Sequence, residues 1–192
     1  MPFNLPNTLT WLRIALIPLF VVVFYLPDGL LPKHSINLYA TLIFALAAVT
    51  DWLDGWLARR LNQMSAFGAF LDPVADKLMV AAALIVLVDL DRAGVDVALI
   101  IIGREIAISA LREWMARLGQ NKEVAVAFIG KLKTAAQMVA ILLLLYHEPI
   151  LGWPHTFILG RWLLYLAALL TLWSMAHYLM AAWRTLAKEP AA

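Results

Sequence analysis

Four aspartates lie close together between residues 51 and 76, in two pairs: Asp51 with Asp54, and Asp72 with Asp76. Residues three or four positions apart share one face of a helix, so each pair brings two carboxylates together. Two like charges about 4 Å apart repel by roughly 4 kcal/mol at an effective dielectric constant of about 20. The group therefore requires a positive partner, and an all-oxygen ligand set favours Mg²⁺ or Mn²⁺. The pattern predicts a divalent-metal site formed by these four aspartates.

The aspartates belong to a longer pattern, D-x2-D-G-x2-A-R-x8-G-x3-D-x3-D, which runs from residue 51 to residue 76. Its other fixed residues are Gly55, Ala58, Arg59 and Gly68. The pattern resembles the signature of the CDP-alcohol phosphotransferase family at all eight fixed positions. The flanking segments 7–13, 72–77, 104–106 and 130–134 resemble the phosphatidylglycerophosphate synthase branch of that family.

This resemblance implies an enzyme that transfers a phosphatidyl group from CDP-diacylglycerol to glycerol 3-phosphate, releasing phosphatidylglycerol phosphate and CMP. It implies two metal ions, one held by Asp51, Asp54 and Asp72 and the other by Asp51, Asp72 and Asp76. It also implies that Asp76 is the catalytic base, taking the proton of the acceptor hydroxyl as that oxygen attacks the β-phosphate. Direct displacement is favoured because no serine, histidine or cysteine nucleophile is required; an aspartyl nucleophile stays open.

A further set of residues is expected to bind the CDP-alcohol. Gly55, Arg59 and Ser65 match family positions that contact the CDP moiety, and the segment 7–10 matches one that helps to cover the nucleotide. Capping of a membrane helix is an alternative role for that segment. A glycine inside a helix costs about 1 kcal/mol, which indicates a close approach to the backbone. The predicted contacts are Asn7, Thr10, Gly55, Ala58, Arg59, Ser65 and Gly68.

Basic residues in the second half of the chain predict a pocket for the acceptor. Charged residues inside an apolar stretch are costly and mark functional sites. A basic pocket beside the metals would suit an acceptor that carries a phosphate. The predicted acceptor-phosphate residues are Arg104, Arg112, Lys131 and Lys133. Two alternatives stay open: Arg104 and Glu105 form a structural ion pair, or the two lysines only anchor a helix end.

Composition identifies an integral membrane protein with a single domain over residues 1–192. Hydrophobic residues make up 64% of the chain and charged residues only 15%, which excludes an ordinary soluble domain. The net charge of +2, without a basic run, argues against a nucleic-acid partner. Six stretches are long and apolar enough for membrane helices. They cover residues 10–27, 36–58, 70–89, 94–116, 125–146 and 157–183.

The basic residues also predict the orientation of the chain. They cluster at one set of helix ends, so the positive-inside rule places both termini and the aspartates on the cytoplasmic side of a bacterial inner membrane. The segment 3–13 is expected to start as a helix lying on the inner surface. The N-terminus has no pattern of a removable signal peptide. Small residues at 81–83 would permit close helix packing, and the resemblance implies a homodimer.

Two other functions remain open from the sequence. The same family could use another acceptor, such as an inositol phosphate or a second phosphatidylglycerol. A divalent-cation transporter would also place aspartates in a membrane. Against transport, the carboxylates gather at one end of the helices, and Arg59 and Arg60 would oppose cation passage.

Overall fold

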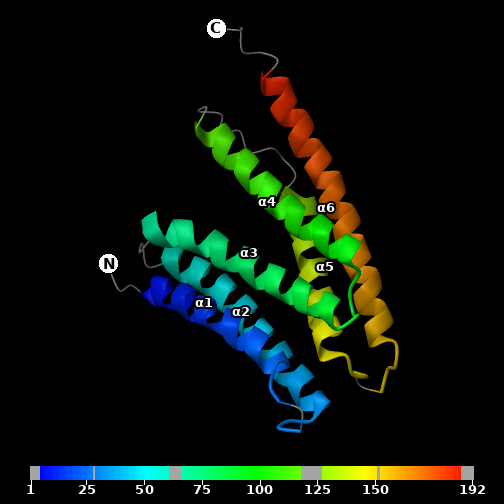
Figure 1. Ribbon diagram of the computed structural model, residues 1–192. Helices are drawn as coiled ribbons and strands as arrows, with labels where there is room; N and C mark the ends of the chain where they lie inside the picture. Colours follow the sequence, from blue (N-terminus) through cyan, green and yellow to red (C-terminus); the bar gives the residue numbers. More distant parts are fainter. Residues whose placement is uncertain (1–4, 28, 61–65, 118–126, 151, 187–192) are drawn as a thin grey trace.

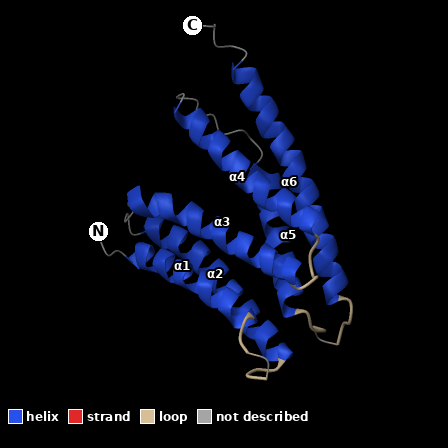
Figure 2. Cartoon of the chain, in the orientation of Figure 1, coloured by secondary structure: helices blue, strands red, loops and turns tan. Residues whose placement is uncertain are grey.

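The computed structural model describes the chain except for residues 1–4, 28, 61–65, 118–126, 151 and 187–192 (Figure 1). The described residues form six α-helices joined by turns and loops (Figure 2). The helices are α1 (Leu5–Phe24), α2 (Lys33–Arg60), α3 (Ala66–Asp89), α4 (Val95–Arg117), α5 (Ala127–Tyr146) and α6 (Thr156–Leu186). Each predicted apolar stretch corresponds to one helix, so the all-α prediction is confirmed.

Two helical segments in the described part of the chain are long and apolar enough to cross a membrane: Lys33–Asp54 and Thr156–Met180. The apolar parts of α1 and α5 are shorter, and α3 and α4 carry several charged residues within their length. The six-span arrangement therefore stays a prediction. The interfacial N-terminal segment also stays a prediction, and within the described residues α1 runs without interruption from Leu5 to Phe24.

The helices form two groups that meet along a common core. α1, α2 and α3 pack against one another, while α6 packs against α4 and α5. The groups are joined by contacts of α5 with α2 and of α4 with α3. Fully buried side chains at this junction include Phe44, Leu84, Leu87, Ile101 and Ile141. From their shared connection, α3 and α4 diverge, so the N-terminal end of α3 and the C-terminal end of α4 lie apart (Figure 1).

Arg92, in the connection between α3 and α4, donates hydrogen bonds to α5 and α2. Its Nη1 donates to the carbonyl oxygens of Leu144 and Leu145 at 3.1 and 2.9 Å, and its Nη2 donates to Asn37 Oδ1 at 2.9 Å. A cation at the C-terminal end of a helix also interacts favourably with the helix dipole. These contacts tie the α3–α4 connection to α5 and α2, at the end opposite to where α3 and α4 diverge (Figure 1).

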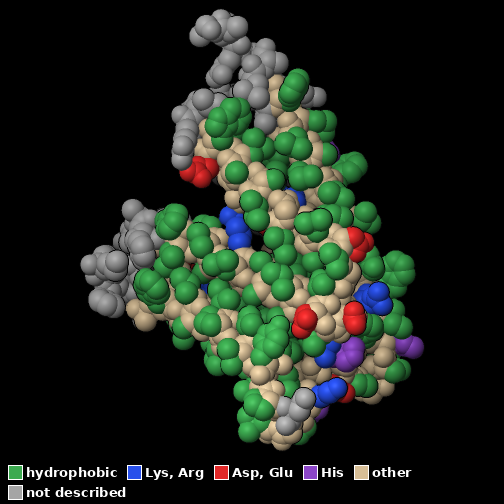
Figure 3. Space-filling model, in the orientation of Figure 1, with side chains coloured by type: hydrophobic (Ala, Val, Ile, Leu, Met, Phe, Trp, Pro, Cys, Tyr) green, Lys and Arg blue, Asp and Glu red, His purple; other side chains and the backbone are tan. Residues whose placement is uncertain are grey.

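Much of the visible surface is apolar, as expected for a membrane protein (Figure 3). Trp52, Leu99, Leu169 and Trp183 are more than 60% exposed although they are large and hydrophobic. Soluble proteins rarely expose apolar surface so extensively. Basic side chains are visible where the two helix groups meet, beside the opening between α3 and α4 (Figure 3).

Candidate active site

The C-terminal part of α2 carries Asp51 and Asp54, and the N-terminal half of α3 carries Asp72 and Asp76. Because α2 and α3 follow each other in the chain and pack together, these ends are neighbours. Asp54 is buried, with 3% of its side chain exposed, whereas the side chain of Asp51 is 43% exposed. The two pairs thus lie at one end of the α1–α3 group, as the spacing predicted.

A third helix, α1, contributes the positive charge between the first pair. Arg13 is buried, with only 1% of its side chain exposed. Its Nη1 donates to Asp51 Oδ1 at 2.5 Å, and its Nη2 donates to Asp54 Oδ2. One turn earlier, Thr10 Oγ1 donates to Asp72 Oδ1 at 2.5 Å. Three of the four aspartates are therefore held by two residues of α1.

Asp76 faces the same space. Arg13, Asp51 and Asp76 line one small cavity, together with Met79 and Met138 among others. Asp76 also lies within electrostatic range of Glu105, which belongs to α4. The side chain of Asp76 is exposed.

The donor set of this site suits a hard divalent cation. Its acidic side chains offer only carboxylate oxygens, which Mg²⁺ and Mn²⁺ prefer. A positive group, the Arg13 guanidinium, already lies between two of the carboxylates and so stands in for a cation. With Arg13 in that position, no three acidic or histidine side chains among the described residues converge tightly enough to hold an ion. The ligand roles of the four aspartates stay predictions.

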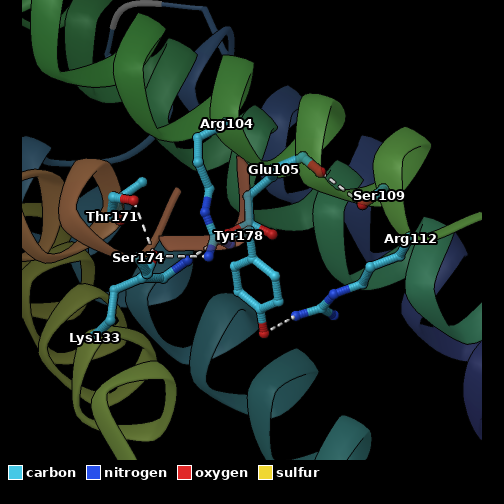
Figure 4. A network of polar contacts seen from close by, with 8 residues as sticks. All are labelled: Arg104, Glu105, Ser109, Arg112, Lys133, Thr171, Ser174 and Tyr178. Atoms are coloured by element: carbon cyan, nitrogen blue, oxygen red, sulfur yellow. Dashed lines mark hydrogen bonds and ion pairs between the residues drawn. The ribbon is translucent and has the colours of Figure 1, made fainter. Parts of the chain in front are cut away.

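A second polar cluster lies at the junction of α4, α5 and α6 (Figure 4). Glu105 Oε1 accepts from Arg104 Nη1 at 3.0 Å and from Lys133 Nζ. Arg104 Nη2 donates to Ser174 Oγ at 2.8 Å. Arg104 and Lys133 are both buried, with 8% and 4% exposed. Three helices therefore enclose two cations with one shared carboxylate.

Arg112 extends this cluster toward the C-terminal end of α4. Its Nη2 lies 3.0 Å from the hydroxyl of Tyr178, and its guanidinium carbon is 5.1 Å from the centre of the tyrosine ring. The guanidinium of Arg104 lies 6.0 Å from the same ring, so the ring is shared by two arginines (Figure 4). Counting Lys133, the contacts among the described residues join three cationic side chains to one carboxylate, Glu105. The surplus of positive charge suits an anionic ligand.

Most of the predicted site residues whose side chains the structure describes lie in one of the two clusters. Thr10 lies at the aspartates, and Arg104, Arg112 and Lys133 share the second cluster. The structural ion pair of Arg104 with Glu105 is present as well. Gly68 is buried in the first turn of α3. Ser65 lies outside the described residues, as do the side chains of Asn7, Gly55, Ala58, Arg59 and Lys131.

Three polar residues of the site were missed from the sequence. Arg13 was given no role at the aspartates beyond its place in the flanking segment 7–13 and among the basic residues, although an arginine one turn after Thr10 shares a helix face with it. Ser174 and Tyr178 are four residues apart in an apolar helix, the spacing of two side chains on one face. That spacing was the available signal.

Comparison with known proteins agrees with this arrangement. The sequence model of the family described as CDP-alcohol phosphatidyltransferase matches residues 3–173. The chain belongs to the CDP-alcohol phosphatidyltransferase family. The family resemblance predicted from the aspartate signature is therefore confirmed, and the chain is a transferase. The matched range includes Arg13, the four aspartates, Arg104 and Lys133, whereas Ser174 and Tyr178 lie just beyond it.

Relatives within the CDP-alcohol phosphatidyltransferase family match nearly the whole chain. Proteins from Escherichia coli (strain K12), Salmonella typhi and Shigella flexneri are each 53% identical over 184 residues, which is 95% of this chain and 96% of theirs. Each is named CDP-diacylglycerol–glycerol-3-phosphate 3-phosphatidyltransferase. The family generally depends on divalent cations, in agreement with the all-carboxylate donor set.

Proposed function

We propose that this protein transfers the phosphatidyl group of CDP-diacylglycerol to glycerol 3-phosphate, giving phosphatidylglycerol phosphate and CMP. One observation carries the proposal: the helices hold a group of four aspartates, three of them bound by α1, and a separate cluster of three cationic side chains around a single carboxylate. The first cluster suits a diphosphate bound with cations, and the second suits an acceptor that carries a phosphate. The names of the relatives support the same pair of substrates.

The aspartates are assigned to two divalent cations, Mg²⁺ or Mn²⁺. Asp51, Asp54 and Asp72 would hold one ion, and Asp51, Asp72 and Asp76 the other. When bound, such ions neutralise a diphosphate and stabilise the leaving phosphate. Since Asp51 and Asp72 belong to both sets, the two ions would share the carboxylates that link α2 to α3.

Asp76 is assigned as the general base. Its side chain is exposed and lines the cavity that also holds Asp51 and Arg13. It also lies within electrostatic range of Glu105, the carboxylate of the basic cluster. An acceptor hydroxyl entering between the two clusters would meet Asp76, which would take its proton as the oxygen attacks the β-phosphate. The displaced group is CMP.

The CDP-alcohol is assigned to the side of the site formed by α1, α2 and α3. Thr10 lies beside Asp72, and Gly68 opens α3 one turn before that aspartate. The other assigned contacts are Asn7, Gly55, Ala58, Arg59 and Ser65. The acyl chains of the lipid would remain among the exposed apolar side chains of these helices.

The acceptor phosphate is assigned to Arg104, Arg112, Lys131 and Lys133. Arg104 and Lys133 are buried, and buried cations are retained where an anion compensates them. Glu105 supplies one negative charge for the pair, so a phosphate would neutralise the remainder. Ser174 orients the Arg104 guanidinium, and Tyr178 orients that of Arg112.

We further propose that the chain crosses a bacterial inner membrane six times, with both termini and the site on the cytoplasmic side, and forms a homodimer. The distribution of basic residues supports this orientation. A site at the inner membrane surface would let a soluble phosphate ester meet a nucleotide whose lipid part stays in the bilayer.

The proposal is tested by CMP release from CDP-diacylglycerol, with purified protein in detergent micelles. Release is expected only when both glycerol 3-phosphate and Mg²⁺ or Mn²⁺ are present. Release with an inositol phosphate or phosphatidylglycerol instead would contradict the acceptor and keep the family. No release with any acceptor, together with cation flux in vesicles, would contradict the assigned chemistry and favour a transporter.

A further inference from the structure

Arg13 is the only charged residue of α1, and it is buried among apolar neighbours. Only 1% of its side chain is exposed, and Phe20 and Leu16 follow it on the buried side of the helix. A buried guanidinium is costly unless anions compensate it. Its position therefore depends on the carboxylates that it contacts.

The guanidinium is divided between two carboxylates. Its Nη1 donates to Asp51 and its Nη2 to Asp54, so each aspartate takes one arm of the fork. Its Nε is buried and has no hydrogen-bond partner among the described residues. Arginine–carboxylate pairs are frequently bidentate, with both arms of the fork on one carboxylate. The divided contact instead fills the space between two groups that would otherwise repel each other.

The same two carboxylates are the ones assigned to a divalent cation. Asp51 Oδ1 and Asp54 Oδ2 point at the guanidinium, so an ion held between the two carboxylates would compete with Arg13 for the space between them. The four aspartates carry four negative charges, and Arg13 supplies one positive charge within direct contact. A doubly charged ion would compensate more of this charge than the guanidinium does. The two cations cannot occupy the same oxygens together.

We propose that Arg13 is the resident counter-ion of the aspartate site, and that an incoming divalent cation displaces its guanidinium from Asp51 and Asp54. This inference rests on the proposed function, which assigns those aspartates to the metal. Before the cation binds, Arg13 holds the two carboxylates together; afterwards, its fork is free to bind another anion, and a guanidinium suits phosphate oxygens. Arg13 is thus a positioning residue that weakens cation affinity while it stabilises the site.

The test compares Mn²⁺ affinity of the full chain in detergent micelles without substrates, using the electron paramagnetic resonance signal of free Mn²⁺. Arg13→Gln removes the competing charge and should bind Mn²⁺ at least about ten-fold more tightly than the unaltered protein. After treatment with a chelator, the same variant should melt at a lower temperature, and Mn²⁺ should raise its melting temperature by more than it raises that of the unaltered protein.

Arg161→Gln is the matched control. Arg161 lies near the start of α6, where its guanidinium is 5.6 Å from the ring of Phe157. The substitution therefore removes the same charge far from the aspartates. Its Mn²⁺ affinity should equal that of the unaltered protein. Arg13→Lys keeps one charge but has a single ammonium group in place of the fork, so its Mn²⁺ affinity should fall between those of the unaltered protein and Arg13→Gln.

Unchanged or weaker Mn²⁺ binding by Arg13→Gln would overturn the inference. If that variant does not fold, nuclear magnetic resonance of arginine side chains in the unaltered protein decides: saturating Mg²⁺ should shift the Arg13 guanidinium signal and leave that of Arg161 in place, and an unshifted Arg13 signal overturns it. CMP release by the same preparation separates the two proposals. Activity with no competition would remove only the role of Arg13, whereas competition with no activity would contradict the proposed reaction.

Discussion

Replacing Lys133 with methionine tests whether the buried basic cluster binds the acceptor. Lys133 is 4% exposed and donates to Glu105 from the N-terminal half of α5, so methionine would fill similar space without the charge. Glu105 would keep its contact with Arg104 at 3.0 Å and would not be left unpaired. The variant should therefore fold, and its main loss should be one cation facing the acceptor phosphate.

The size of the effect follows from the lost contact. A hydrogen bond to a charged group contributes about 1.5–3 kcal/mol, and each 1.4 kcal/mol corresponds to about a factor of ten. The KM for glycerol 3-phosphate should rise by roughly ten-fold to a hundred-fold in Lys133→Met. The KM for CDP-diacylglycerol should change little, because the nucleotide is assigned to α1, α2 and α3. Lys33→Met, which alters an exposed lysine at the start of α2, should leave both constants unchanged.

A double variant separates binding from simple charge balance. If Lys133 only neutralises Glu105, then removing both charges in Lys133→Met with Glu105→Gln should restore the KM for glycerol 3-phosphate. If Lys133 binds the phosphate, the KM should stay high. Steady-state CMP release with each substrate varied in turn measures both constants. Equal increases for both substrates, or full restoration by the second substitution, would refute an acceptor site at this lysine.

Three other predictions concern the general base Asp76, the contacts of Arg92 at the α3–α4 connection, and the dependence of stability on pH. Asp76→Asn should abolish turnover while CDP-diacylglycerol still binds, as measured by single-turnover kinetics and calorimetry; near-normal turnover would exclude it as the base. Arg92→Met should lower the free energy of unfolding by about 1.5–3 kcal/mol, because Asn37 and two carbonyls of α5 lose a charged donor. An unchanged melting temperature would contradict a stabilising role for these contacts. Partial burial lowers the pKa of His147 below its usual value, and the positive charge of Arg92 lowers it further. The negative charge of Glu148 opposes both effects but does not cancel them. In the acid range the folded state then binds fewer protons than the unfolded state, so the free energy of unfolding should be at its full value above about pH 6.5 and decline as the pH falls below it. His147→Asn should flatten this decline. An equal dependence on pH in both proteins would contradict the role given to His147.

The helices could be predicted from the sequence because apolar runs and breakers are local signals. All six predicted stretches contain a helix, and the largest difference at a start is at α1, which begins at Leu5 instead of near residue 10. Proline is accepted in the first turn of a helix, so Pro6 does not delay the start. Packing between helices depends on long-range contacts, and no local pattern indicated which helices would pair.

The candidate site also combines residues that local sequence spacing indicates with residues that only long-range contacts bring in. The aspartates could be predicted because their spacing falls within two neighbouring segments of the chain. Arg13 could not be assigned to them from spacing alone, since 38 residues separate it from Asp51. Ser174 lies 70 residues after Arg104, and only the fold brings the two together. Spacing could mark such residues as sharing a helix face, but their partners on other helices follow only from the three-dimensional arrangement.

The most direct test of the proposed chemistry is incorporation of radiolabelled glycerol 3-phosphate into lipid by the purified protein supplied with CDP-diacylglycerol. Labelled phosphatidylglycerol phosphate should form with Mg²⁺ or Mn²⁺, in amounts equal to the CMP released, and a chelator or Asp76→Asn should stop it. Labelled lipid that forms at the same rate with the chelator and with Asp76→Asn would contradict a reaction centred on these aspartates.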